Sequence, residues 1–419
     1  MFFRPAIFDT FKGEYHLSFL KRDFFSGLTV AIVAIPLSIA FAIASGATPI
    51  VGIFTAIIGG LVVSFLGGSK YNISGPAGAF IGVIYGIIAN YGYSGLIIST
   101  FIAGLLIILF SILNCGKLIK YIPNCVIIGF GIGLGIDIMS GQIADFLGIH
   151  IHGCENFIKK ISACMEHINQ TNFNSLFLGT LTIILVAIIR KIRPSLPVFL
   201  IAIIISCIVS QIFHFQVETI SSRFGTMHLA IPDINKEIFE EFTHPFHLLQ
   251  FFFPSLAIAI LASIEALLAA TIADKMRNDT HNSNTELFSL GVGNCISALF
   301  GCLPIAGTTA RTIVNAKSGA KSSLAGVFHA VFLIVLMALF AEIISTVNMP
   351  TIAGILFVVS FDMIAYKKVI TLCKNEDKIS ICIMLFTAIC VLVFGIVFAI
   401  IFNTIIYQII RILRLKNKI

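Results

Sequence analysis

Two short stretches rich in glycine, proline and hydroxylated residues interrupt the apolar sequence and could bind an anion. One runs from Ser74 to Ala79 and the other from Pro304 to Thr309. A helix that begins after such a break leaves backbone N–H groups unpaired, and its positive dipole end attracts negative charge. Small side chains let an anion reach those amides. Together the stretches predict a site made largely of backbone, whereas a kink or close helix packing explains either one alone.

Three charged residues lie within otherwise apolar segments. Arg311 follows the second stretch and could add positive potential or close the site; alternatively it reaches the membrane surface or pairs with a distant carboxylate. Glu265, the most deeply placed acid, must be protonated, paired with a cation or turned to a polar cavity. Each case could couple anion movement to protons or Na⁺, with a structural contact to Arg311 or the backbone as the alternative. For Asp137 we favour a structural role.

Other residues that could do chemistry give weaker signals. His150 and His152 form an HxH pair, but we find too few further ligands and interpret the segment as an exposed loop. Cys154 and Cys164 share one polar loop and could form a disulfide if it faces an oxidising compartment. The sequence has no phosphate-binding GxxxxGK[ST], HExxH or GxSxG motif, which argues against an ATP-driven pump or a hydrolase. We expect neither a cofactor nor a metal.

The composition places these residues in a membrane protein. Of 419 residues, 58% are hydrophobic and 11% charged, far from the roughly 25% charged residues of soluble domains. Apolar runs of about twenty residues recur, each long enough to cross a bilayer, and they are continuous, which indicates helices and not barrel strands. The net charge of +7 is spread over short loops, so membrane topology explains it better than nucleic-acid binding does.

The apolar runs predict an all-α protein of about fourteen spans. We expect a cytoplasmic lead over 1–24, a seven-span repeat over 25–215, an extracytoplasmic connection over 216–250, a second repeat over 251–413 and a cytoplasmic tail over 414–419. The connection contains a β-like piece, Thr226 to Ile231. The expected spans are about 25–45, 49–66, 78–89, 95–113, 121–147, 176–191, 196–213, 251–273, 287–302, 308–318, 323–344, 349–364, 379–393 and 395–413.

Loop charge sets the expected orientation. Every second connection is basic, and basic connections tend to remain in the cytoplasm. We therefore expect these connections and both termini to be cytoplasmic, and the protein to lie in the cytoplasmic membrane. The basic residues of these connections and of the tail are Lys117, Lys120, Arg190, Lys191, Arg193, Lys275, Arg277, Lys317, Lys321, Lys367, Lys368, Lys374, Lys378, Arg411, Arg414, Lys416 and Lys418.

The two halves of the chain repeat each other. The first apolar run begins near Phe25 and the first run after the connection over 216–250 begins near Phe251, and the two glycine-proline breaks have a similar spacing. Because each half has an odd number of spans, the halves must insert in opposite orientations, as in secondary transporters with inverted repeats. The two short segments after the breaks, the third and the tenth, would then meet at a shared centre.

The same residues carry a resemblance to a known family. The chain resembles the membrane domain of the SulP family, the sulfate-permease anion transporters, over essentially its whole length. The eighth-to-tenth-span region is the most specific. The matching stretches are Asp23–Gly46, Leu66–Phe80, Ser263–Asn294 and Pro304–Gly326, with a lesser match at Ser140–Ile149.

The resemblance implies a fold and a site. The fold is UraA-like: fourteen segments in two inverted seven-segment repeats, with core and gate domains that move as an elevator. A homodimer is also implied. The substrate anion would lie between segments three and ten, with side chains from segments one and eight. The matching positions are Leu37, Phe41, Ala77, Gly78, Ala79, Gly307, Thr308, Thr309 and Arg311 for the substrate and Glu265 for the coupling ion.

The sequence departs from the family pattern at several points. Many members have Gln where Leu37 stands and Tyr where Phe41 stands, so two polar contacts are missing here. Members that use Na⁺ tend to have a hydroxyl at the position of Ala269, which puts Na⁺ coupling in doubt. Members usually end in a cytoplasmic STAS domain, whereas this sequence stops at Ile419, so we expect the membrane domain only.

We therefore expect a secondary active transporter of a small inorganic anion, sulfate or bicarbonate first, that works by proton coupling or exchange. The alternatives are a dicarboxylate transporter of the same family, a nucleobase–cation symporter of the same fold, and an anion channel. A membrane enzyme is the least expected class.

Overall fold

The computed structural model describes residues 4–12, 15–117, 122–149, 157–193, 196–227, 248–375 and 378–416. Within these ranges the chain is almost entirely helical. Isoleucine is the most frequent residue of the sequence, although β-branched residues favour strands in water. In a bilayer every backbone polar group needs a partner within the protein, and a helix provides one within its own segment.

The first half of the chain contains long helices separated by one break. Its elements are α1 (Ile7–Lys12), α2 (Leu17–Ala44), α3 (Pro49–Leu66), β1 (Ser74–Gly75), η1 (Gly78–Phe80), α4 (Ile81–Ile112), α5 (Asn124–Leu147), α6 (Phe157–Glu166), η3 (Ile168–Gln170), α7 (Phe173–Ile192), α8 (Val198–Ile212) and α9 (Ile220–Phe224).

The second half repeats the pattern, with its own break before a short helix. Its elements are η4 (Leu249–Phe251), α12 (Phe252–Arg277), α13 (Ser283–Leu299), β2 (Ala306–Gly307), α14 (Thr309–Lys317), α15 (Leu324–Ser345), α16 (Met349–Ile364), α17 (Tyr366–Asn375), α18 (Lys378–Phe394) and α19 (Ile396–Lys416).

Local sequence explains several helix ends. Pro49 occupies the first turn of α3, where its missing N–H costs nothing. The side chains of Asn172 and Asn282 accept hydrogen bonds from free amides at the starts of α7 and α13. Gly148 ends α5 in the left-handed conformation, with φ of 67°.

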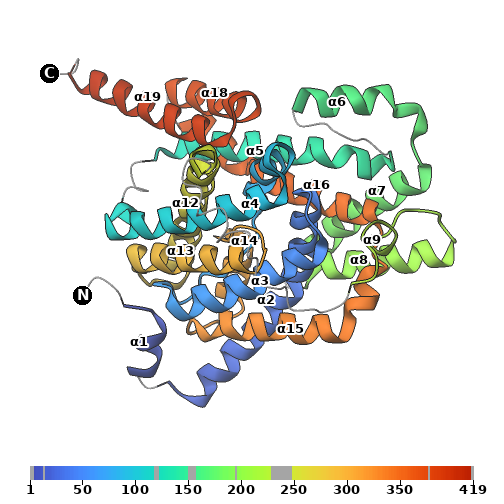
Figure 1. Ribbon diagram of the computed structural model, residues 1–419, viewed down its shortest axis with the longest axis horizontal. Coiled ribbons are helices and arrows are strands. Elements are labelled where there is room, and N and C mark those ends of the chain that lie inside the picture. Colours follow the sequence, from blue (N-terminus) through green and yellow to red (C-terminus); the bar gives the residue numbers. More distant parts are fainter. Residues whose placement is uncertain are drawn as a thin grey trace.

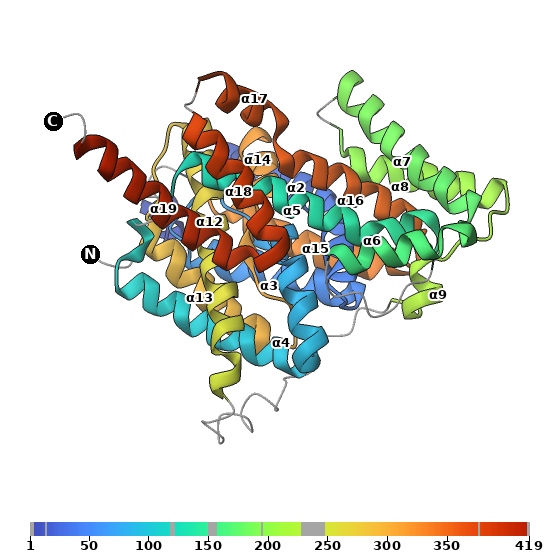
Figure 2. The ribbon, with the colours of Figure 1, turned by 90° about the horizontal axis from the view of Figure 1, so that it is seen from above.

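The helices form two bundles, which we call the core bundle (α2, α3, α4, α12, α13, α14 and α15) and the gate bundle (α5, α7, α8, α16, α18 and α19). Most packing occurs within each bundle, for example between α13 and α4 in the core and between α16 and α5 in the gate. Each bundle takes helices from both halves of the chain, as interlocked repeats require. The gate bundle lies along the top and right of Figure 1, and the core bundle fills the centre and lower left. Figure 2 shows the same division from above.

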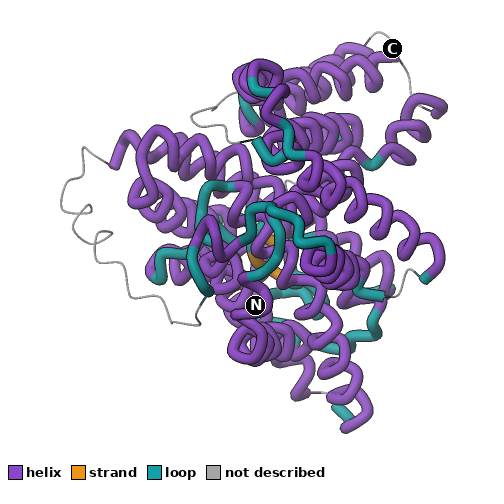
Figure 3. The backbone as a smooth tube through the Cα atoms, turned by 90° about the vertical axis from the view of Figure 1, so that its right-hand side faces the viewer, coloured by secondary structure: helices purple, strands orange, loops and turns teal. Residues whose placement is uncertain are grey.

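The two breaks meet at the centre of the core bundle. β1 and β2 pair as antiparallel strands, with Ser74 opposite Gly307 and Gly75 opposite Ala306. Figure 3 shows these strands in orange, enclosed by helices. All four paired residues are buried. The sequence predicted that the breaks meet but not that they pair as strands.

Contacts between connections define two faces of the molecule. On the first, which we call the N-terminal face, Ala6 N donates to Gly67 O at 2.8 Å and Asn282 N to Gly68 O at 3.1 Å. On the opposite face, which we call the α6 face, Ile220 N donates to Val347 O at 2.9 Å. Successive connections along the chain therefore lie on opposite faces, as expected of helices that cross a membrane.

The expected spans each have a helical counterpart. Spans three and four form one helix, α4, which is bent at Gly92, where φ is 70°. In the described part of the chain, eight helical stretches are long and apolar enough to cross a membrane, and three further apolar helices are shorter. The short helices α6, α9 and α17 lie in stretches that we expected to be loops. Most of the β-like piece from Thr226 to Ile231 lies outside the described residues.

Exposed apolar side chains mark the lipid-facing surface. On α8, Ile204, Ile208 and Ile212 are exposed by 49%, 49% and 65% of their surface. Their spacing of four residues places them on one side of the helix. Such a stripe would favour aggregation in water and is the expected surface toward lipid.

Candidate functional site

The paired strands fix the relative position of two helix starts. The η1–α4 helix begins at Gly78 and runs toward the α6 face, whereas α14 begins at Thr309 and runs toward the N-terminal face. Their N-caps, Ala77 and Thr308, make no side-chain cap hydrogen bond. Two positive dipole ends therefore meet at the strands with first-turn amides that no cap side chain occupies. This arrangement suits a negatively charged ligand.

Hydrogen bonds across the strands hold this geometry. Thr308 N donates to Ile73 O at 3.0 Å, and Ile73 N donates to Thr312 Oγ1 at 3.0 Å. Asn294 binds the second break through its side chain, since Ile305 N donates to its Oδ1 at 2.9 Å. The breaks are therefore ordered structure, in which buried backbone groups find partners although no helix supplies them.

Glycine is required where helices approach the strands closely. A Cβ atom at Gly307 would lie 2.7 Å from Ala266 Cα on α12. A Cβ atom at Gly59 on α3 would lie 3.0 Å from Gly75 N. Because these neighbours are backbone atoms, they cannot rotate away. The helix that carries Glu265 thus lies directly against the second strand.

The side chains expected from α2 lie beside the first helix start. Phe41 is buried, and a Cβ atom at Gly78 would lie 3.2 Å from its Cε1 atom. Leu37 is also buried, one turn earlier on the same helix. Ala77 and Ala79 are buried on the first segment, as is Thr308 on the second. Thr309 is only half-buried, so the start of α14 is partly accessible.

Arg311 is buried without a counter-charge. Its side chain is 1% exposed, and its Nη2 atom donates to Ser38 Oγ at 3.0 Å and to Pro76 O at 3.4 Å. Its Nε and Nη1 atoms have no hydrogen-bond partner in the described part of the chain. It neither reaches the membrane surface nor pairs with a described carboxylate. A buried charge costs several kcal/mol unless compensated, so this position calls for a negative ligand.

Glu265 is also unpaired. It is half-buried, and within the described ranges its carboxylate makes no hydrogen bond or ion pair, either with Arg311 or with the backbone. The structural contact considered as an alternative role for this residue is therefore absent from those ranges. A carboxylate in this position is free to bind and release a proton or a cation.

The sequence missed the residues that support the site from the N-terminal face. Asn72 Nδ2 donates to Glu286 Oε1 at 2.6 Å, and Asn72 Oδ1 accepts from Thr312 Oγ1 at 2.9 Å. Glu286 is fully buried and also accepts from Ser69 N at 2.9 Å. This chain of hydrogen bonds ties the loop before β1 to α13 and α14. The one signal for it was the polar run around Glu286, which ordinary helix capping also explains.

A second polar cluster lies in the connection between α12 and α13. His281 Nδ1 contacts Asp274 Oδ2 at 2.6 Å, and Lys70 pairs with Asp279 at 2.8 Å. Burial alone would lower the pKa of His281, but the hydrogen bond to Asp274 and its charge raise that pKa above its usual value. The cluster holds the connection against the loop before β1.

The weaker candidates lie elsewhere. Asp137, on α5, accepts a hydrogen bond from Lys160 Nζ at 3.3 Å. His150, His152 and Cys154 lie outside the described residues, so the disulfide to Cys164 stays a prediction. Within the described ranges no three His, Cys, Asp or Glu side chains are grouped as a metal site.

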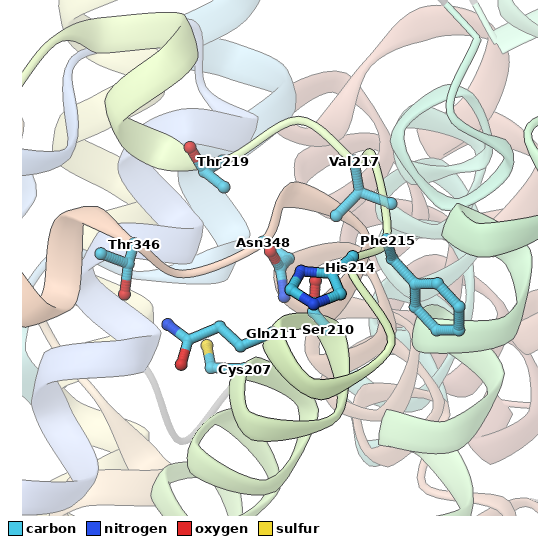
Figure 4. Close-up of a pocket in the computed structure, with 9 residues that line it drawn as sticks. All are labelled: Cys207, Ser210, Gln211, His214, Phe215, Val217, Thr219, Thr346 and Asn348. Atoms are coloured by element: carbon cyan, nitrogen blue, oxygen red, sulfur yellow. The ribbon is translucent and has the colours of Figure 1, made fainter.

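A cavity of about 510 Å³ lies away from the strands, where the C-terminal end of α8 faces the connection between α15 and α16. Figure 4 shows the side chains of Gln211, His214 and Asn348 around it. None of the expected site residues lines this cavity.

Comparisons with known proteins agree with this architecture. The model of the sulfate permease family matches residues 20–387. YvdB of Bacillus subtilis (strain 168), named as a candidate sulfate transporter, is 37% identical over 371 residues, which cover 88% of this chain and 69% of YvdB. The bicarbonate transporter BicA of Picosynechococcus sp. is 31% identical over 364 residues, which cover 84% of this chain and 63% of BicA. This chain thus spans about two thirds of the length of these relatives.

Solved structures share the fold. The transmembrane domain of a cyanobacterial bicarbonate transporter BicA superposes with a TM-score of 0.80 at 28% identity, over 93% of this chain and 97% of that domain. The murine anion transporter Slc26a9 superposes with a TM-score of 0.84 at 13% identity, over 98% of this chain and 71% of Slc26a9, which supports the fold alone. The expected UraA-like arrangement of two inverted repeats is confirmed. The chain belongs to the sulfate permease family.

Proposed function

We propose that this protein is a secondary active transporter of a small inorganic anion, with sulfate or bicarbonate as the first candidates. The pairing of β1 with β2 carries the proposal, because it directs two uncapped helix starts at one point beside a buried arginine that has no described carboxylate partner. The relatives named for sulfate and bicarbonate transport support the choice of anions.

The residues proposed to bind the anion are those around the two helix starts. Backbone amides after Ala77 and Thr308 would hold it, and Gly78 and Gly307 would let it approach. Arg311 would supply positive potential from behind the first strand. Leu37 and Phe41 would form an apolar wall on the α2 side. Ala79 and Thr309 complete the set.

The two bundles suggest how the anion crosses. The site lies within the core bundle, and packing between the bundles is sparse compared with packing inside each. The core bundle can therefore slide along the gate bundle and carry the anion with it, as an elevator. We place the chain in the cytoplasmic membrane with the N-terminal face in the cytoplasm, because basic loops gather on that face. We also propose a homodimer, on the family resemblance.

Glu265 is proposed to couple transport to protons or to serve in exchange. It lies next to Ala266, which packs against Gly307, so a change in its protonation occurs close to the anion. A Na⁺ site is less well supported, because the position one turn further on is Ala269.

Flux measurements in proteoliposomes test the function. We expect a pH gradient, or a counter-anion on the opposite side of the membrane, to drive the uptake of labelled sulfate or bicarbonate. Competition by nucleobases but not by anions would assign the protein to the symporters of the same fold. Single-channel currents in a planar bilayer would instead identify a channel.

A further inference from the structure

A cavity of about 410 Å³ opens between the core and gate bundles on the α6 side of the strands. Ile43 and Ile81 line it from the core, and Asp137, on α5, and Lys160, on α6, line it from the gate side. Ile81 directly follows η1, and Ile43 lies two residues beyond Phe41. The cavity therefore borders the segments that carry the proposed anion site.

The two cations that the described residues place at this cavity differ in how fully they are paired. Arg223 Nη2 contacts Asp145 Oδ1 at 2.7 Å and also pairs with Glu218. Among the described residues, Lys160 Nζ contacts one carboxylate, that of Asp137, with 3.3 Å between Nζ and Oδ1. An ammonium group has three donors, so Lys160 keeps the capacity to bind a second anionic group, whereas two carboxylates already hold Arg223.

Lys160 connects the two bundles. It contacts Asp137 of the gate bundle, and its Nζ lies 5.8 Å from the ring centre of Tyr85 on core helix α4. One turn before Tyr85, α4 approaches the same carboxylate so closely that a Cβ atom at Gly82 would lie 2.7 Å from Asp137 Oδ2. Any sliding of the core bundle along the gate bundle must change these contacts.

We propose that this cavity is the entrance to the anion site from the α6 face and that Lys160 is the residue that first binds the anion. The inference rests on the proposed transport function. An arriving anion binds the donors of the Lys160 ammonium that Asp137 leaves free, and Asp137 competes with it for that ammonium. The anion then moves toward Arg311, which has no described carboxylate competing for it. Lys160 thus acts as a specificity residue that admits anions, and Asp137 is its competitor.

Two substitutions should change uptake in opposite directions. Initial rates of labelled sulfate and bicarbonate uptake are measured from the α6 face in right-side-out vesicles and from the N-terminal face in inside-out vesicles. We expect Lys160→Gln to raise the KM from the α6 face about fivefold and Asp137→Asn to lower it, because electrostatic attraction in a partly enclosed cavity aids capture. The KM from the N-terminal face should stay unchanged. Lys159→Gln, a change at an exposed neighbour on α6, is the matched control.

Three outcomes for the KM of the two variants would overturn the inference. If Lys160→Gln and Asp137→Asn both leave KM unchanged, shift it in the same direction or alter it equally from both faces, the ion pair is only structural. If the wild-type protein moves neither anion, the proposed transport function is overturned, and with it this entrance.

Discussion

Arg311 and Arg223 show two opposite ways of placing an arginine in one protein. Arg223 lies near the α6 face, 27% exposed at its side chain, and two carboxylates pair with it. Arg311 is fully buried, and its described partners are a hydroxyl and a carbonyl. The partners of Arg223 neutralise its charge within the protein, whereas the charge of Arg311 has no described counter-charge. The difference supports the proposal that Arg311 serves a ligand, whereas the two ion pairs of Arg223 connect parts of the structure.

The carboxylates Glu286 and Glu265 follow the same division. Glu286 is fully buried and accepts hydrogen bonds from Asn72 Nδ2 and Ser69 N. Glu265 lies on the neighbouring helix, is half-buried and has no described partner. Arg311 and Glu265, which have no described counter-charge, thus lie close to the strands, whereas Glu286 and Arg223 have hydrogen-bond or ion-pair partners. A charged group without a partner costs stability, so the presence of such groups at these positions points to a function.

Removal of the unpaired arginine should have the largest effect on transport. We expect Arg311→Ala to reduce anion uptake at least about 100-fold, which corresponds to about 2.7 kcal/mol. Uptake in proteoliposomes and the yield of folded protein are measured together, with Arg190→Ala, a change at an arginine paired with Asp362, as the control. Ser38→Ala, which removes one partner of Arg311, should give a smaller loss. Undiminished uptake by Arg311→Ala would break the comparison between the two arginines.

A bulky side chain at Gly78, where the η1–α4 helix begins, should reduce uptake nearly as strongly as the removal of Arg311. Gly78→Val places a branched side chain against the Phe41 ring and the free amides, so we expect uptake to fall about 30-fold or more, about 2 kcal/mol. Gly86→Val is the matched control, because a Cβ atom there has no neighbour within 4 Å and lies on the same helix. Equal uptake by the two variants would contradict a binding role for the η1–α4 start.

Neutralisation of the unpaired carboxylate should change how uptake depends on pH. If Glu265 carries protons, wild-type uptake rises as the pH on the entry side falls, and Glu265→Gln removes that dependence while it keeps the shape of the side chain. Glu342→Gln, a change at an exposed residue of α15, is the control. A pH profile that is unchanged in Glu265→Gln would exclude the residue from coupling.

The paired arginine, by contrast, should affect stability more than transport. Arg223→Gln removes two partly exposed ion pairs, which we expect to contribute about 1 kcal/mol together. For a protein of this size the melting temperature in detergent should fall by about 2 °C, with uptake from the N-terminal face nearly unchanged. A loss of uptake as large as that of Arg311→Ala would mean that both arginines serve the anion.

Sequence patterns predicted the helices better than the contacts at the site. Long apolar runs fix helix positions because a bilayer leaves the backbone few choices, and the two breaks showed where helices must start inside the membrane. The pairing of Ser74 with Gly307 depends on residues more than 230 positions apart, and no local pattern encodes it. The same holds for the bond from Arg311 to Ser38 and for the position of Asn72 between Glu286 and Thr312. Lys160 fell in a stretch interpreted as a loop, so its place in a cavity needed the structure.

The smallest effect should come from a paired group on the N-terminal face, His281. Its contact with Asp274 raises its pKa, so it contributes stability that is fully present below the unfolded pKa, about 6.5. This contribution is lost as the pH rises through the higher folded pKa. We therefore expect thermal stability to decrease by about 1 kcal/mol as the pH rises from below 6.5 through that range, and His281→Gln to flatten this part of the curve.

The measurement is a series of melting curves in detergent, with His214→Gln, a change at an exposed histidine on the α6 face, as the control. A pH dependence that persists in His281→Gln would show that other groups cause it. Because Asp274 satisfies His281, its titration should change stability but not the pH dependence of uptake, which we assign to Glu265. If His281→Gln also altered the uptake profile, a partnered group would take part in coupling, and the division between paired and unpaired charges would fail.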